Sequence, residues 1–125
     1  MKCVDCLLLS AAAGLAMLLV SGITHAQDAA VVNPKTIRVR LENDRVRVLE
    51  AVIPPGTKEQ MHSHPANVIH VVEGGKLRSH SPGGKATETT FESGDVLYRE
   101  PVTHWAENIG TTQLRVIIVE LKGSG

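Results

Sequence analysis

The stretch that decides the fold runs from residue 56 to residue 74 and reads GTKEQMHSHPANVIHVVEG. His62 and His64 stand two residues apart in it, and residues at this spacing on a β-strand point to the same face of the sheet. Two imidazoles on one face converge on a single point, which a metal site needs and a hydrophobic core does not. Neutral imidazole is a favoured ligand for Zn, Fe, Ni, Cu and Mn. The stretch therefore predicts a strand that carries two metal ligands.

The rest of the chain shows the same period of two residues. Apolar and polar residues alternate over 36–41, and 46–51 and 114–121 follow the pattern less strictly. Strict alternation is typical of half-buried strands, and no window shows a convincing helical repeat. Turn signals rich in Gly, Pro, Asn and Asp recur at short spacing, at 42–44, 54–56, 74–75, 81–84, 93–95 and 108–110. We therefore expect one all-β domain of eight or nine short strands, built as a barrel or a sandwich.

The N-terminal segment has the order of a secretory signal peptide. Lys2 precedes an apolar run over 7–20, and small residues lead to Ala26, after which we predict cleavage. A permanent membrane anchor is the alternative, but the run is shorter than the roughly 18–20 residues that span a bilayer. The predicted organisation is a signal peptide at 1–26, a loose or docked leader at 27–34, a barrel at 35–122 and a tail at 123–125. We expect an exported protein, either periplasmic or secreted, with no membrane association after cleavage.

Composition excludes several classes of function. The chain has 13 basic and 13 acidic residues, and no basic run stands out, which argues against nucleic acid and anionic membranes as partners. Both cysteines, Cys3 and Cys6, lie in the segment predicted to be removed. The mature chain therefore has neither a disulfide nor a cysteine-ligated zinc site.

A third metal ligand has to come from elsewhere in the chain. His104 is the best placed, because it starts a late strand after 101–103 and hairpins bring distant strands together. His70 is three residues from Asn67, so on a regular strand it points to the opposite face, and we interpret it as a surface or contact residue. His80 precedes a turn and is interpreted as a solvated hairpin residue. The predicted ligand set is His62, His64 and His104.

Two stretches resemble the paired sequence motifs of the cupin superfamily. Residues 56–74 resemble the first motif, in which Gly, His-X-His, Glu and Gly follow at set spacings, and its glycines and histidines match at Gly56, His62, His64 and Gly74. Residues 94–108 resemble the second motif and match it at Gly94, Pro101, His104 and Asn108. The whole chain from 36 to 121 is similar to small single-domain cupins. This resemblance implies a double-stranded β-helix, also called a jelly roll, with the metal inside the barrel, and a homodimer.

The chain departs from the first motif at its carboxylate. The motif's Glu corresponds to Asn67. Asn67 could bind the metal weakly through its neutral carbonyl oxygen, it could hydrogen-bond one of the metal ligands, or it could leave the fourth coordination position to water. In the second motif the turn is one residue short and has lost its Gly. Three-histidine sites also occur in thiol dioxygenases of the superfamily. Three neutral ligands leave the ion its full positive charge, which favours a small anionic ligand or substrate.

Three functions remain open at this point. The first is a metalloenzyme, oxygenase- or isomerase-like, that uses a divalent ion (Fe, Mn, Zn or Ni) on a small anionic molecule, with Glu100 as the better guess for a general base. The second is a metal-dependent binding module without turnover. The third is a structural barrel that the metal staples. An apolar cavity with a few convergent polar groups favours the first two, and a plugged barrel mouth favours the third.

Overall fold

The computed structural model describes residues 27–123, so the predicted signal peptide at 1–26 and residues 124 and 125 lie outside the described part. These residues form a short helix, α1 (Ala29–Val32), and nine strands. The strands are β1 (Ile37–Glu42), β2 (Val46–Ile53), β3 (His62–His64), β4 (Asn67–Glu73), β5 (Gly75–His80), β6 (Ala86–Phe91), β7 (Val96–Arg99), β8 (Val102–Asn108) and β9 (Leu114–Leu121). The all-β prediction is confirmed. Within 27–123, no helix is long and apolar enough to span a membrane.

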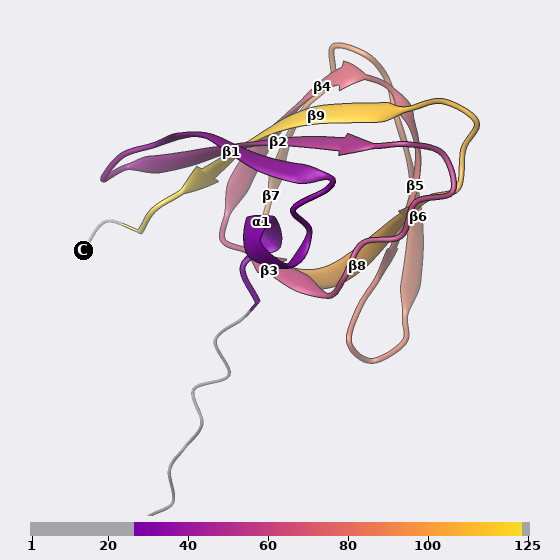
Figure 1. Cartoon of the computed structure of the whole chain (residues 1–125), viewed down its shortest axis with the longest axis horizontal. Helices are drawn as coiled ribbons and strands as arrows, with labels where there is room; N and C mark the ends of the chain where they lie inside the picture. Colours follow the sequence, from indigo (N-terminus) through magenta and orange to yellow (C-terminus); the bar gives the residue numbers. More distant parts are fainter. Residues whose placement is uncertain (1–26, 124–125) are drawn as a thin grey trace, which may run out of the picture.

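The strands form two antiparallel sheets that enclose a barrel (Figure 1). The larger sheet has the order β1-β2-β9-β4-β7, and the smaller one has the order β3-β8-β5-β6. The N-terminal β2 therefore pairs with the C-terminal β9 over the full length of both strands. Such long-range pairing is what closes a chain of hairpins into two facing layers.

Aliphatic side chains fill one part of the barrel. Alternate residues of the central strands point inward, so β9 buries Leu114, Val116 and Ile118, while β2 buries Leu49 and Ile53. Leu49 is completely buried. Burying one such side chain contributes roughly 1.5–3 kcal/mol to folding. The next inward residue of β9 after Ile118 is a glutamate, Glu120, and there the lining of the barrel changes from apolar to polar.

The predicted leader docks on the barrel. Asp28 caps α1 by accepting hydrogen bonds from the backbone N–H groups of Ala30 and Val31, and it forms an ion pair with Arg47 of β2. The hydrogen bond from Arg47 lowers the pKa of Asp28. Ala29 is buried, and the backbone of Asp28 forms an isolated β-bridge with Ser63 of β3. Of the two states considered for this segment, the structure shows the docked one.

The outer face of the larger sheet carries a row of apolar side chains. Cross-strand register aligns Leu41, Val48, Val119, Val68 and Tyr98, one from each strand in sheet order. Leu41 is 50% exposed and Tyr98 is 58% exposed. The row crosses the whole sheet on the side that faces away from the barrel interior.

Candidate metal centre

The three predicted ligands lie together at the polar end of the barrel. β3 pairs with β8 so that His62 is directly opposite His104, and His64 follows on the same face of β3. One ring nitrogen of each imidazole lies within 4.8 Å of the others. His62 and His64 are buried, and His104 is partly buried. The prediction that these residues converge is confirmed.

The hydrogen-bond partners of His62 and His64 determine their tautomers. Nδ1 of His62 is 2.6 Å from the carbonyl oxygen of Gln60, and Nδ1 of His64 is 2.7 Å from Oε1 of Glu120. A carbonyl and a carboxylate oxygen accept hydrogen bonds, so these contacts favour the tautomer with the proton on Nδ1 in both rings. Nδ2 of Asn33 also lies 3.0 Å from Nδ1 of His62, at a longer distance than the carbonyl oxygen of Gln60. The unprotonated Nε2 is then the atom available to a metal, as in metal sites whose other ring nitrogen donates to an acceptor.

His104 is held in the same way from the neighbouring strand. Its Nδ1 is 2.6 Å from the hydroxyl oxygen of Ser79 on β5, which can accept a hydrogen bond from the ring N–H group. Burial lowers the pKa of His104 to about 3, and the nearby His62 and His64 add to the effect. Burial also lowers the pKa of His62. These two imidazoles are therefore neutral at pH 7, the form that binds a metal.

The structure explains why both glycine positions of the first motif require glycine. Gly56 has a φ of 77°, in the left-handed region that glycine adopts without strain. Gly74 passes so close to the backbone of Phe91 that a Cβ atom at this position would collide with its carbonyl oxygen. The two glycines therefore fix the ends of the segment that presents His62 and His64.

Asn67 lines the same cavity, and one of its polar atoms has no partner among the described residues. The side chain is 2% exposed, and its Nδ2 donates to the carbonyl oxygen of Pro65 at 2.8 Å. Its Oδ1 is buried without any hydrogen bond within 27–123. Such an oxygen is costly to bury alone, so it fits a missing donor or metal ion. The donor set of three imidazoles and one amide oxygen suits a divalent transition metal.

Sequence reasoning missed Glu59 as a cavity residue. Glu59 is 8% exposed, its Oε2 is 3.7 Å from Nε2 of His62, and Oε1 accepts a hydrogen bond from Thr36. It lies outside any strand, so the two-residue period gives no information about its direction. Glu100, the predicted general base, is exposed between β7 and β8 and does not line the cavity. Its role stays a prediction, and the carboxylate that the structure brings beside the histidines is Glu59.

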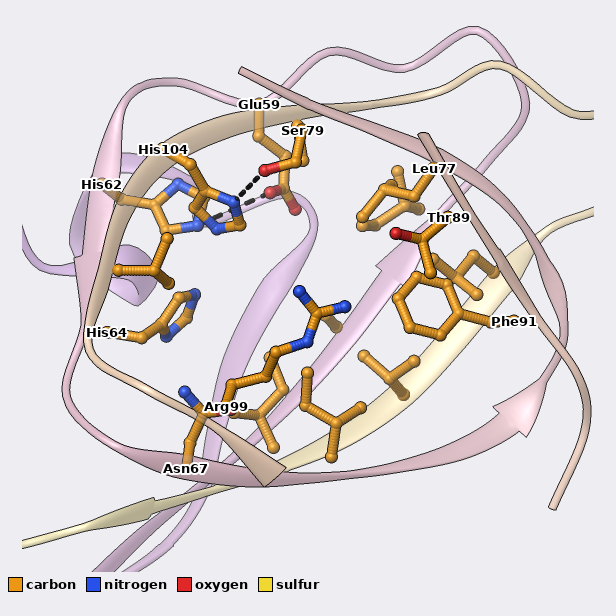
Figure 2. A pocket seen from close by; sticks show the side chains of 18 of the residues that line it. Glu59, His62, His64, Asn67, Leu77, Ser79, Thr89, Phe91, Arg99 and His104 are labelled. Atoms are coloured by element: carbon orange, nitrogen blue, oxygen red, sulfur yellow. Dashed lines mark hydrogen bonds and ion pairs between the residues drawn. The ribbon is translucent and has the colours of Figure 1, made fainter. Parts of the chain in front are cut away.

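The histidine cluster opens into a cavity of about 220 Å³ inside the barrel (Figure 2). Aliphatic side chains and Phe91 form most of its wall. Glu59 and Ser79 lie at the histidine end, whereas Thr89 lies beside Phe91 (Figure 2). Arg99 extends from β7 into the middle of this space (Figure 2). The volume is below the roughly 300–1,000 Å³ of sites for drug-sized ligands, so the cavity suits a smaller molecule.

The two other histidines of the barrel lie outside this cavity. His70 is exposed on β4. His80 stacks on Trp105 with ring centroids 3.7 Å apart, and its Nε2 is 3.3 Å from Glu107. Asn108 is buried and donates to the carbonyl oxygens of Ile53 and Thr112, so it fixes the backbone at these two places.

Comparison with known proteins agrees with this geometry. The family described as "Cupin domain" matches residues 49–120, more than half of the chain. The chain belongs to the cupin domain family. Its double-stranded β-helix fold, predicted from the paired motifs, is confirmed by solved cupins of the same fold. No curated protein matches the sequence.

Several solved structures resemble this cupin. A cupin domain protein from Bordetella pertussis is 28% identical, with a TM-score of 0.63 over 70% of this chain and 92% of that one. A double-stranded β-helix protein from Klebsiella pneumoniae is 25% identical, with a TM-score of 0.51 over 70% and 76%. An RmlC-like cupin from Methanocaldococcus jannaschii is 15% identical, with a TM-score of 0.54 over 68% and 77%, and it shows the fold alone.

Glu59 predicts a pH dependence of stability in the metal-free protein. Burial raises the pKa of Glu59 from 4.5 to about 7, so between these values the folded chain holds a proton that the unfolded chain has lost. The stability contributed by this proton is complete below pH 4.5 and is lost as the pH rises through 7. Glutamine does not titrate, so Glu59→Gln does not lose this stability. When the pH is raised from 4.5 to 8, the free energy of unfolding of the variant should increase by about 3 kcal/mol relative to that of the wild type.

The measurement is urea denaturation of EDTA-treated protein at both pH values. Contributions from the histidines cancel, because wild type and variant share them. Glu92→Gln is the control, because its exposed side chain is solvated in both states and its effect should be equal at the two pH values. An equal effect of Glu59→Gln at both values contradicts the burial of this carboxylate in solution.

Proposed function

We propose that this cupin is a metal-dependent enzyme that binds a divalent ion through Nε2 of His62, His64 and His104 and acts on a small anionic molecule in the barrel cavity. The observation that carries the proposal is the arrangement of the three Nδ1 atoms. Each is hydrogen-bonded to a group outside the cluster, which leaves three ring nitrogens for one shared ligand. Buried histidines that serve only packing have no need of this common orientation.

The proposed ligands determine the net charge of the metal centre. Three neutral imidazoles and the amide oxygen of Asn67 leave a divalent ion with its full charge, which favours an anionic ligand. When bound, the ion supplies Lewis acidity or, for iron, oxygen chemistry. The outer partners Gln60, Ser79 and Glu120 hold the rings in position, and their contacts raise the basicity of the imidazoles.

Glu59 is the group that can move a proton in this cavity. Its Oε2 faces Nε2 of His62 at 3.7 Å, while Thr36 fixes the other carboxylate oxygen. A molecule held near the histidines would therefore meet a positioned carboxylate, which a general base requires. Most of the wall around the same space is apolar. A metal that only stapled the barrel would need neither the cavity nor this carboxylate, so both features support the ligand-binding functions.

Metal analysis tests the proposal. Untagged protein purified without added metal should contain about one divalent ion per chain by inductively coupled plasma mass spectrometry. A His62→Ala/His104→Ala double variant should lose it, because one remaining imidazole binds a divalent ion too weakly to retain it through purification.

His70→Ala is the matched control, because this exposed histidine lies on β4 away from the cluster and its loss should leave the metal content unchanged. Substoichiometric metal in wild type that the double variant does not reduce contradicts the proposed centre. Circular dichroism of the double variant checks that the barrel still forms.

We also propose that the protein is exported. The order of charge, apolar run and small residues up to Ala26 supports this. Expression of the full chain in a Gram-negative host should give a periplasmic protein whose N-terminal sequence starts at Gln27. Ala26→Arg should block cleavage, because the protease requires a small residue there. A wild-type protein that keeps Met1 and stays in the cytoplasm contradicts export.

We propose, finally, that two copies pair through the outer face of the larger sheet. The apolar row described above crosses that sheet. A two-fold axis would place this row against the same row of the second copy. Desolvating it would be the driving force.

Sedimentation velocity should therefore give twice the mass of one chain for wild type. Tyr98→Lys should shift the protein to monomer, because the charge would be buried twice in the contact. Thr90→Lys, on the exposed side of β6 in the other sheet, should remain dimeric. A monomeric wild type at tens of micromolar, or equal effects of the two variants, contradicts this interface.

A further inference from the structure

Arg99 is a cation inside the barrel that the metal centre does not use. β7 alternates, so Val96 is 67% exposed and Tyr98 is 58% exposed, whereas Leu97 and Arg99 are turned toward the interior. Figure 2 shows its side chain reaching from the β7 wall into the middle of the cavity, with the guanidinium between the histidines and Phe91. The guanidinium carbon is 5.8 Å from the centre of the Phe91 ring.

The guanidinium has no acceptor among the described residues. Within 27–123, Arg47, Arg78 and Arg115 each form an ion pair with a carboxylate, but no carboxylate lies within 4.0 Å of Arg99 and none of its side-chain nitrogens has a hydrogen bond. Arg99 is half-buried, and its guanidinium lies in a cavity with mostly apolar walls. A planar anion that takes two parallel hydrogen bonds matches this fork of free donors.

The neighbour of Arg99 across the sheet strengthens this argument. Asn67 of β4 is its register partner, so both side chains enter the cavity from adjacent positions on one face. Oδ1 of Asn67 is buried without a partner within the described part of the chain, yet Arg99 does not donate to it. Arg99 therefore offers its donors to the cavity and not to Asn67. A ligand with acceptor atoms completes the hydrogen bonds of Arg99 at this place.

The rest of the cavity wall indicates the chemistry of the other end of that ligand. Ile69, Leu77, Phe91 and Leu114 give the cavity a mostly apolar wall, which Thr89 interrupts with one hydroxyl group. The cavity holds only about 220 Å³, so the ligand is small. An anionic head beside Arg99 and an apolar body against Phe91 satisfy both regions, whereas a sugar or a nucleotide would leave polar groups unpaired against this wall.

We propose that Arg99 binds the carboxylate of a small carboxylic acid with an apolar body, and thereby determines which anions the cavity accepts. A small carboxylic acid is then the substrate class of the proposed function. The role of Arg99 rests on that function in one respect, namely that the cavity is a ligand site. Arg99 carries the same recognition with or without a metal, because its guanidinium alone supplies the paired donors for a carboxylate.

Calorimetric titration with 4-methylpentanoate and its uncharged amide tests the assignment. Wild type, both as purified and after metal removal, should bind the acid more tightly than the amide. Arg99→Met should weaken the acid about 10- to 100-fold, the range for losing hydrogen bonds to a charged group, and leave the amide unchanged. Arg99→Lys should give an intermediate affinity, because it keeps the charge but loses the two-pronged geometry.

Arg45→Met is the matched control, because it removes the same charge from an exposed position outside the cavity. Unchanged circular dichroism and metal content of Arg99→Met show that the barrel and the metal centre are intact. The assignment is overturned if wild type binds neither probe, if it binds acid and amide equally, or if Arg45→Met weakens the acid as much as Arg99→Met. A protein without metal that still prefers the acid would overturn the metal function and keep this one.

Discussion

The pairing of β3 with β8 is the constraint on which the site depends. β3 has only three residues, and its register with β8 sets His62 against His104. A slip of one residue would turn His62 and His64 to the other face of the sheet together. Three outer contacts then fix the rings, through Gln60, Ser79 and Glu120. The strand pairing brings the imidazoles together, and these contacts decide which nitrogen each presents.

The docked N-terminal segment supports this end of the barrel through two chains of contacts. In the first, Oδ1 of Asn33 accepts from the backbone N–H of Gln60, whose carbonyl oxygen holds His62. In the second, Arg47 contacts Asp28 on one side and lies 3.9 Å from Glu120, which holds His64. Two of the three histidines therefore depend on residues that precede β1. A segment that resembles a linker in the sequence thus acts as part of the site's support.

The sequence predicts the histidine cluster because its signals are local and periodic. His62 and His64 share a face by spacing alone, and the paired motifs indicate His104 as their partner. The same alternation places Glu120 after Ile118 on β9 and Arg99 after Leu97 on β7, both pointing inward. Inward polar positions at strand ends were therefore a signal that sequence reasoning left unused.

Other parts of the site have no such signal. Glu59 and Asn33 lie in irregular backbone, where no period fixes the direction of a side chain. Their positions follow from long-range contacts, Glu59 with Thr36 and Asn33 with Gln60, that only the folded chain provides. The role of Glu100 as a base rests on its nearness to a ligand in the sequence and stays a prediction, and such nearness says little about nearness across a barrel.

The charges inside the barrel argue for a ligand that is part of the folded site. Glu120 is matched by His64 and Arg47, so it is satisfied within the protein. Glu59 faces neutral imidazoles, and Arg99 has no carboxylate within 4.0 Å among residues 27–123. A barrel that served only stability would have no need of these groups in its interior. Glu59 and Arg99 line one small, mostly apolar cavity without pairing with each other, and this is the charge arrangement that the proposed ion and anion would complete.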